Sequence, residues 1–222
     1  MVLAALVSVI WGVTFIVIPL ALRSFSPPQL TALRFLIAAL PVMFLPRPRI
    51  APAMLLLIGL TLFTGQFLLL FFAYTNGLPP GVASVTQQMQ AFFTVLLSAL
   101  FLRDIPGRAQ TVGLAVAFCG LALVGVTVGA DLTATGLALG LGGAFSWAIG
   151  NVLVKRQGRM PMLPLMAWLS LVPPLPAIVV AWLINPAAPW LGSAVLHAST
   201  TSLLAVVYIG LVATTFAYAV WG

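Results

Sequence analysis

Uncharged polar side chains set inside long apolar runs are the groups in this sequence best suited to chemistry with a solute. Residues 80–102 hold four of them at helical spacing: Gln87, Gln90, Thr94 and Ser98. At about 100° per residue these side chains fall within about 80° of one another and form one stripe. Amides and hydroxyls facing lipid are costly, so the stripe must face protein or water. It predicts either hydrogen bonds between helices or a cavity lining that offers donors and acceptors to a zwitterion.

Other apolar runs hold further candidates for a cavity wall. Trp11 and Trp147 each stand in the middle of a run, where an interfacial aromatic belt would not place them, and packing is the alternative role. Asn151 follows Trp147 by one helical turn, and Tyr218 lies in the last run. Gln66 is the lone amide of its run, with bonding between helices as its alternative. The predicted substrate-binding residues are therefore Gln87, Gln90, Thr94, Trp11, Gln66, Trp147, Asn151 and Tyr218.

Arg34 is the charged residue that lies inside an apolar run. It stands about five residues into the run 29–45, a depth of about 8 Å at about 1.5 Å per residue. A charge inside the membrane favours a functional role, here contact with a substrate carboxylate or gating. At this depth the long side chain can instead reach the outer surface or bind helix-end carbonyls, so a structural role stays open.

Catalytic and metal-binding patterns are absent from the sequence. The carboxylates are limited to Asp104 and Asp131, which lie in connections between apolar runs. A single cysteine, Cys119, excludes an internal disulfide and is expected to be a small buried apolar residue. The net charge of +7 comes from scattered residues rather than a nucleic-acid-binding stripe. We expect a small polar solute and lipid as partners, and no enzyme activity, cofactor, metal or nucleic acid.

The composition shows which elements must position these side chains. Hydrophobic residues make up 63% of the 222 residues and charged residues 5%, with a mean hydropathy of +1.22. A soluble domain carries about 25% charged residues, so the surrounding medium must be lipid. Spanning a hydrocarbon core of about 30 Å takes about 20 apolar residues per helix, whereas membrane β-strands are shorter and alternate. The composition predicts an all-α polytopic membrane protein.

Apolar runs and loop charges predict the topology. Eight runs are long enough for transmembrane helices: 1–21, 29–45, 53–75, 80–102, 108–127, 134–154, 164–184 and 200–221. Positive residues prefer cytoplasmic loops. With the N-terminus in the cytoplasm, Arg23 is the positive residue of the outer loops, and the inner loops hold Arg47, Arg49, Arg103, Arg108, Lys155, Arg156 and Arg159.

Similar features recur in the same order along the chain. Trp11 and Trp147 hold matching places in the first and sixth runs, and Ile-Gly-Leu stands at both 58–60 and 209–211. These matches predict a first repeat of five helices at 1–127 and a second at 134–222. Five helices per repeat make the copies antiparallel, a construction typical of secondary transporters.

The second repeat is expected to be incomplete. If Gly222 pairs with Phe71, about 56 residues of the first repeat have no counterpart, enough for two helices. A homodimer is one way to complete such a fold.

Longer strings of residues carry a family resemblance. The first half holds Ile-Trp-Gly at 10–12 with Phe15, Leu-Arg-Phe at 33–35, and Gln-Met-Gln-Ala-Phe-Phe-Thr at 88–94 with Leu-Arg-Asp at 102–104. The second half holds Ala-Phe-Ser-Trp-Ala at 144–148, Gly-Asn at 150–151 and Tyr-Ile-Gly-Leu-Val-Ala at 208–213. Along essentially its whole length the chain resembles the EamA family of the drug/metabolite transporter superfamily, most closely its O-acetylserine/cysteine exporter branch.

This resemblance implies ten helices in two inverted five-helix repeats around a central cavity, eight of them in this chain. It implies export of small amino-acid metabolites across the bacterial inner membrane, and we expect O-acetylserine/cysteine-like solutes moved by alternating access. The chain departs from the family pattern at Asp104, where glutamate is usual, and in stopping after the eighth helix. The alternatives are export of other amino acids or metabolites, a membrane-embedded enzyme, and a structural membrane protein.

Overall fold

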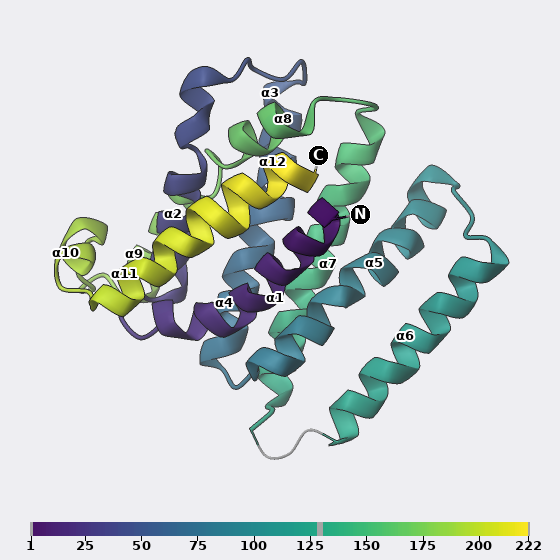
Figure 1. Cartoon of the computed structure of the whole chain (residues 1–222), viewed down its shortest axis with the longest axis horizontal. Coiled ribbons are helices and arrows are strands. Elements are labelled where there is room, and N and C mark those ends of the chain that lie inside the picture. Colours follow the sequence, from purple (N-terminus) through teal and green to yellow (C-terminus); the bar gives the residue numbers. More distant parts are fainter. Residues whose placement is uncertain (1, 128–130, 222) are drawn as a thin grey trace.

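The computed structural model describes residues 2–127 and 131–221, and within these ranges the chain forms helices joined by short connections, with no strand (Figure 1). Six helical stretches are long and apolar enough to cross a membrane: Leu3–Ala21, Pro27–Phe44, Pro52–Thr75, Pro80–Leu102, Ala134–Arg156 and Met162–Ile184. The chain is therefore a polytopic α-helical membrane protein, as its composition predicts.

Several of these stretches consist of more than one helical segment. The first half contains α1 (Val2–Ala21), α2 (Pro27–Ala38), η1 (Leu40–Phe44), α3 (Pro52–Ile58), η2 (Gly59–Gly65), α4 (Gln66–Thr75), α5 (Pro80–Leu102) and α6 (Arg108–Thr127). The second half contains α7 (Ala134–Arg156), α8 (Met162–Leu169), α9 (Pro174–Ile184), α10 (Leu191–Leu196), α11 (Thr200–Val207), η3 (Tyr208–Phe216) and α12 (Ala217–Trp221).

Helix starts follow from local sequence. At α2 the Ser26 side chain accepts from the Gln29 backbone N–H, and Gln29 Oε1 accepts from the Ser26 N–H at 2.9 Å. This reciprocal capping box satisfies two donors that a helix start leaves unpaired. Prolines stand in the first turn of α2, α3, α5 and α9, where their fixed φ suits a helix and the missing N–H is not needed.

Glycines let α7 approach its neighbours closely. A Cβ placed on Gly150 would lie 2.6 Å from Leu62 Cβ, and one on Gly143 would lie 3.0 Å from the Gln66 carbonyl oxygen. Small residues that bring backbones together are typical of helix contacts in membranes. As a result α7 packs against η2, α4 and α5 and forms one wall of the space between the helices.

Two helical stretches contain π-helical turns, η2 and η3, at the places where the Ile-Gly-Leu string recurs. In η2 the Thr64 hydroxyl donates to the Gly59 carbonyl at 3.3 Å. In η3 the Thr215 hydroxyl donates to the Gly210 carbonyl at 3.1 Å. Both bonds reach back five residues, the span of a π turn, which is rare in helices and frequent near functional sites.

The glycines of these π-helical turns touch the opposite half of the chain. A Cβ on Gly59 would lie 2.6 Å from Val172 Cβ, between α8 and α9. A Cβ on Gly210 would lie 2.8 Å from Ile37 Cβ, near the end of α2. Each half therefore presents a glycine to a β-branched side chain of the other.

The remaining contacts define a central group of helices and one outlying helix. α1 packs against α5, α11, η3 and α12, while α2 packs against α4, α9 and η3. α6 lies at the edge of the molecule beside α5, and its side chains are mostly exposed (Figure 1). Cys119 of α6 is therefore exposed, and the expectation that it would be buried was wrong. The apolar run gave no information on which face of α6 has a neighbour.

The connection after α5 meets the last turn of α7. Lys155 Nζ forms an ion pair with Asp104 Oδ2, and both side chains are exposed. The loop charges assign both residues to the cytoplasmic side, so this contact is consistent with their placement on a common side.

Candidate functional site

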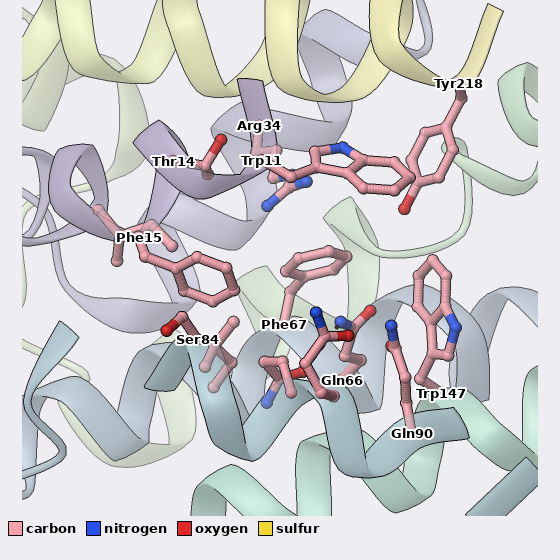
Figure 2. Close-up of a pocket in the computed structure, with 14 residues that line it drawn as sticks. Trp11, Thr14, Phe15, Arg34, Gln66, Phe67, Ser84, Gln90, Trp147 and Tyr218 are labelled. Atoms are coloured by element: carbon pink, nitrogen blue, oxygen red, sulfur yellow. Dashed lines mark hydrogen bonds between the residues drawn. The ribbon is translucent and has the colours of Figure 1, made fainter. Parts of the chain in front are cut away.

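A cavity of about 130 Å³ lies between α1, α4, α5, α7 and α12, with α2 behind it (Figure 2). A buried water needs about 10–15 Å³ on the same scale, so the cavity has room for a small solute. The predicted residues that line it are Trp11, Arg34, Gln66, Gln87, Gln90, Trp147 and Tyr218. These side chains come from six helices and from both halves of the chain.

The predicted residues Thr94 and Asn151 do not line this cavity. Thr94 lies beyond Gln90 on α5, and Asn151 faces it from α7, with Asn151 Nδ2 donating to Thr94 Oγ1 at 3.4 Å. The polar stripe of α5 thus lines the cavity at Gln87 and Gln90 and leaves it at Thr94.

Two glutamine side chains form a hydrogen-bonded chain at the cavity wall. Gln66 Nε2 donates to Gln87 Oε1 at 3.2 Å, and Gln87 Nε2 donates to the Gly140 carbonyl at 3.1 Å. Both side chains are buried. Gln66 Oε1 is also buried and has no hydrogen-bond partner among the described residues. The chain therefore ends in a free acceptor.

Aromatic rings form another part of the cavity wall. The Trp147 and Tyr218 rings are stacked, with centroids 6.2 Å apart and planes 19° apart. Trp11 lies 5.8 Å from Tyr218, and its Nε1 donates to the Ala213 carbonyl at 3.0 Å. In Figure 2, Trp11 and Tyr218 lie across the cavity from Gln66 and Trp147. Uncharged donors and acceptors thus line the cavity together with flat apolar surfaces.

Arg34 turns inward and is 3% exposed, so it does not reach the outer surface, one of the structural roles left open by the sequence. Its Nε donates to Thr214 Oγ1 at 2.9 Å, and its Cζ lies 3.7 Å from the centre of the Phe67 ring. Nη1 has no hydrogen-bond partner among the described residues. The guanidinium is held from two sides and still has a free donor.

The sequence also missed several lining residues. Thr14, Phe15 and Ile18 line the cavity from α1, and Ser84 lines it from α5. The α1 residues follow Trp11 by three, four and seven positions, and Ser84 precedes Gln87 by three. Helical periodicity from the predicted residues would have found all four. Leu70 follows Gln66 by four positions and carries the same signal, whereas Gln88 and Phe67 do not.

Comparisons with known proteins point to one family. Residues 1–126 match the EamA-like transporter family. A relative from Salmonella typhimurium (strain LT2), described as a "Probable amino-acid metabolite efflux pump", is 37% identical over 227 residues, covering 99% of this chain and 76% of the relative. A protein of the same description from Escherichia coli (strain K12) is 37% identical over 228 residues, covering 100% and 76%.

Two further similarities concern the membrane and the fold. An uncharacterized inner membrane transporter of Escherichia coli (strain K12) is 31% identical over 158 residues, 67% of this chain and 50% of the relative. A solved crystal structure aligns with a TM-score of 0.69 over 99% of this chain and 76% of that chain, and at 19% identity it shows the fold alone. The family match covers more than half of the chain, and the 37% identity extends over nearly all of it. The chain therefore belongs to the EamA-like transporter family of the drug/metabolite transporter superfamily and is a multi-pass protein of the inner membrane.

Proposed function

We propose that this transporter exports small amino-acid metabolites of the O-acetylserine/cysteine kind across the inner membrane. The observation that carries the proposal is a cavity inside the spanning helices, lined by amides and aromatic rings from both halves of the chain. Amides can pair with both the ammonium and the carboxylate of a zwitterion. The relatives described as amino-acid metabolite efflux pumps support the same class of solute.

In this proposal the cavity residues have distinct tasks. Gln66, Gln87 and Gln90 contact the polar groups of the solute, and the rings of Trp11, Trp147 and Tyr218 enclose its apolar part. Thr94 continues the polar face of α5, and Asn151 faces it from α7. Both contact the solute along its route, exchanging their mutual hydrogen bond for bonds to it.

We propose alternating access by two inverted repeats, one at 1–127 and one at 134–222. The chain would then supply eight spans of a ten-helix 5+5 fold, with its N-terminus in the cytoplasm. The paired π-helical turns support the repeat, because Gly59 and Gly210 each touch the opposite half. Opening the cavity to one side and then the other requires the two halves to move against each other at such contacts.

Transport is favoured over catalysis by the positions of the two carboxylates. Asp104 pairs with Lys155 at the surface, and Asp131 is also exposed. Neither lines the cavity, so neither is placed to act there as an acid or base.

An export assay tests the proposal. Overexpression of the protein should lower intracellular O-acetylserine and cysteine and raise both in the medium, and Gln90→Ala should reduce this export because it removes a half-buried amide from the cavity. Gln157→Ala is the matched control, since that amide bonds within α7 at 3.3 Å and lies outside the cavity. If wild-type protein leaves both metabolites unchanged, the assignment of these solutes is wrong, although the chain remains a transporter.

A further inference from the structure

Arg34 brings to the cavity a positive charge that no carboxylate neutralises. Its guanidinium is almost fully buried, and Asp104 and Asp131, the acidic residues of the sequence, are both exposed and outside the cavity. A buried ion is costly to leave unpaired. The guanidinium is permanently charged at physiological pH, so the protein cannot relieve this cost by losing a proton.

The neighbours of Arg34 fix where its free donor lies. Thr214 holds Nε, the Phe67 ring lies 3.7 Å from Cζ, and the Phe35 ring lies 5.5 Å from it. The ring faces attract the cation, yet they accept no strong hydrogen bond from Nη1. A planar guanidinium held in this way presents N–H groups in the geometry that suits a carboxylate.

Gln66 Oε1, which also lacks a partner among the described residues, has the opposite character: it is an acceptor. The Gly140 carbonyl can only accept, so Gln87 must turn its Nε2 toward it. Gln87 Oε1 is then left for Gln66, which must donate Nε2 and leave its own oxygen free. A backbone carbonyl thus sets the direction of the whole chain, and the atom left free at Gln66, a residue that lines the cavity, is an acceptor rather than a donor.

We propose that Arg34 binds the carboxylate of the transported solute and that Gln66 Oε1 accepts a hydrogen bond from its ammonium group. Arg34 and Gln66 enter the cavity from opposite sides, where they can engage two ends of one small molecule (Figure 2). The same cation repels solutes that carry only a positive charge. The cavity thus selects α-amino acids over amines of the same size. This inference rests on the proposed export function and adds the groups that the solute must carry.

Three thiol compounds distinguish the proposed contact at Arg34 from the proposed contact at Gln66. Cysteine carries both groups, cysteamine lacks the carboxylate, and 3-mercaptopropionate lacks the ammonium. Each is tested as a competitor of radiolabelled cysteine transport in proteoliposomes containing the purified protein. Because hydrogen bonds to charged groups contribute about 1.5–3 kcal/mol, wild-type protein should prefer cysteine to cysteamine by about tenfold or more.

Substitutions at Arg34 and Gln66 test which residue is responsible for the preference over cysteamine and which for the preference over 3-mercaptopropionate. Arg34→Gln should remove the preference for cysteine over cysteamine, and Arg34→Lys should retain part of it because the charge remains. Gln66→Leu should reduce the preference for cysteine over 3-mercaptopropionate and leave the preference over cysteamine in place. Thermal unfolding of each purified variant is measured beside the transport assay, to distinguish loss of binding from loss of folding.

The outcomes are distinguishable. If wild-type protein transports cysteine yet binds cysteamine equally well, the role of Arg34 is wrong while the export function stands, and this result needs no variant to fold. If Arg34→Gln and Arg34→Lys both weaken the binding of all three compounds equally, the role of Arg34 is purely structural and the inference is overturned. If wild-type protein does not transport radiolabelled cysteine, the proposed function fails first.

Discussion

At the residue scale, the hydrogen-bonded amides of Gln66 and Gln87 connect helix packing to solute contact. Gln87 lies between the Gly140 carbonyl of α7 and the Gln66 side chain of α4, so it joins three helices. A change at this residue should therefore alter stability and transport together.

Gln87→Leu keeps the approximate size of the side chain and removes both hydrogen bonds. We expect it to lower stability by about 1 kcal/mol, since hydrogen bonds between membrane helices contribute about 0.6–1.7 kcal/mol. Transport should fall because Gln66 loses its fixed orientation. Thermal unfolding and cysteine transport of the purified protein measure the two effects. Gln157→Leu is the control and should change stability by less than about 0.5 kcal/mol. A Gln87→Leu variant equal to wild type in both would remove this amide from the site.

The sequence allowed part of this site to be predicted. Helical periodicity alone placed Gln87 and Gln90 on one face of a helix, and both line the cavity. The bond between Gln66 and Gln87 had no local signal, because it depends on how α4 and α5 approach α7. The inward turn of Arg34 likewise depends on Thr214, which lies 180 residues away in the chain.

At the element scale, the π-helical turns η2 and η3 each place a glycine against a side chain of the opposite half. A methyl group on Gly210 would come within 2.8 Å of Ile37 Cβ and 3.2 Å of the Arg34 carbonyl oxygen. Neither neighbour is the end of a flexible side chain, so a backbone must move to make room.

Gly210→Ala should therefore lower stability by about 1–3 kcal/mol, the usual cost of overpacking a well-packed interior. Gly113→Ala of α6 is the matched control, because a Cβ there meets nothing within 4 Å. Alanine favours a helix over glycine by up to about 1 kcal/mol, so the control should equal or exceed wild type. Thermal unfolding midpoints in one detergent provide the measurement, and equal effects of the two substitutions would show that the close contact is unimportant.

Most helix positions could be predicted from the sequence, but their interruptions could not. The run predicted at 80–102 coincides with α5, and the run at 108–127 with α6. The π turns at Gly59 and Gly210 lie where a glycine packs close to a β-branched side chain that is distant in the sequence, and hydropathy gives no sign of such a contact. The exposure of Cys119 was missed for a related reason, since an equally apolar helix can face protein or lipid.

At the scale of the whole molecule, loop charges predict the orientation in the membrane. Arg23 and Arg159 are both exposed, and the proposed topology places them on opposite sides. In a Cys119→Ser background, a membrane-impermeant maleimide should label Arg23→Cys in intact cells. It should label Arg159→Cys only after the inner membrane is opened. The reverse pattern would place the N-terminus outside.

The hydrogen bond from Gln87 to the Gly140 carbonyl has an evolutionary consequence. A main-chain carbonyl is present whatever residue the codon for position 140 specifies. Mutations at position 66 or 87 can shorten or abolish the chain of amides. As long as both glutamines remain, mutations elsewhere do not reverse the direction of its hydrogen bonds. The direction of these hydrogen bonds is thus determined by the backbone. Homologous proteins that keep both glutamines can change their solute specificity only through other residues of the cavity.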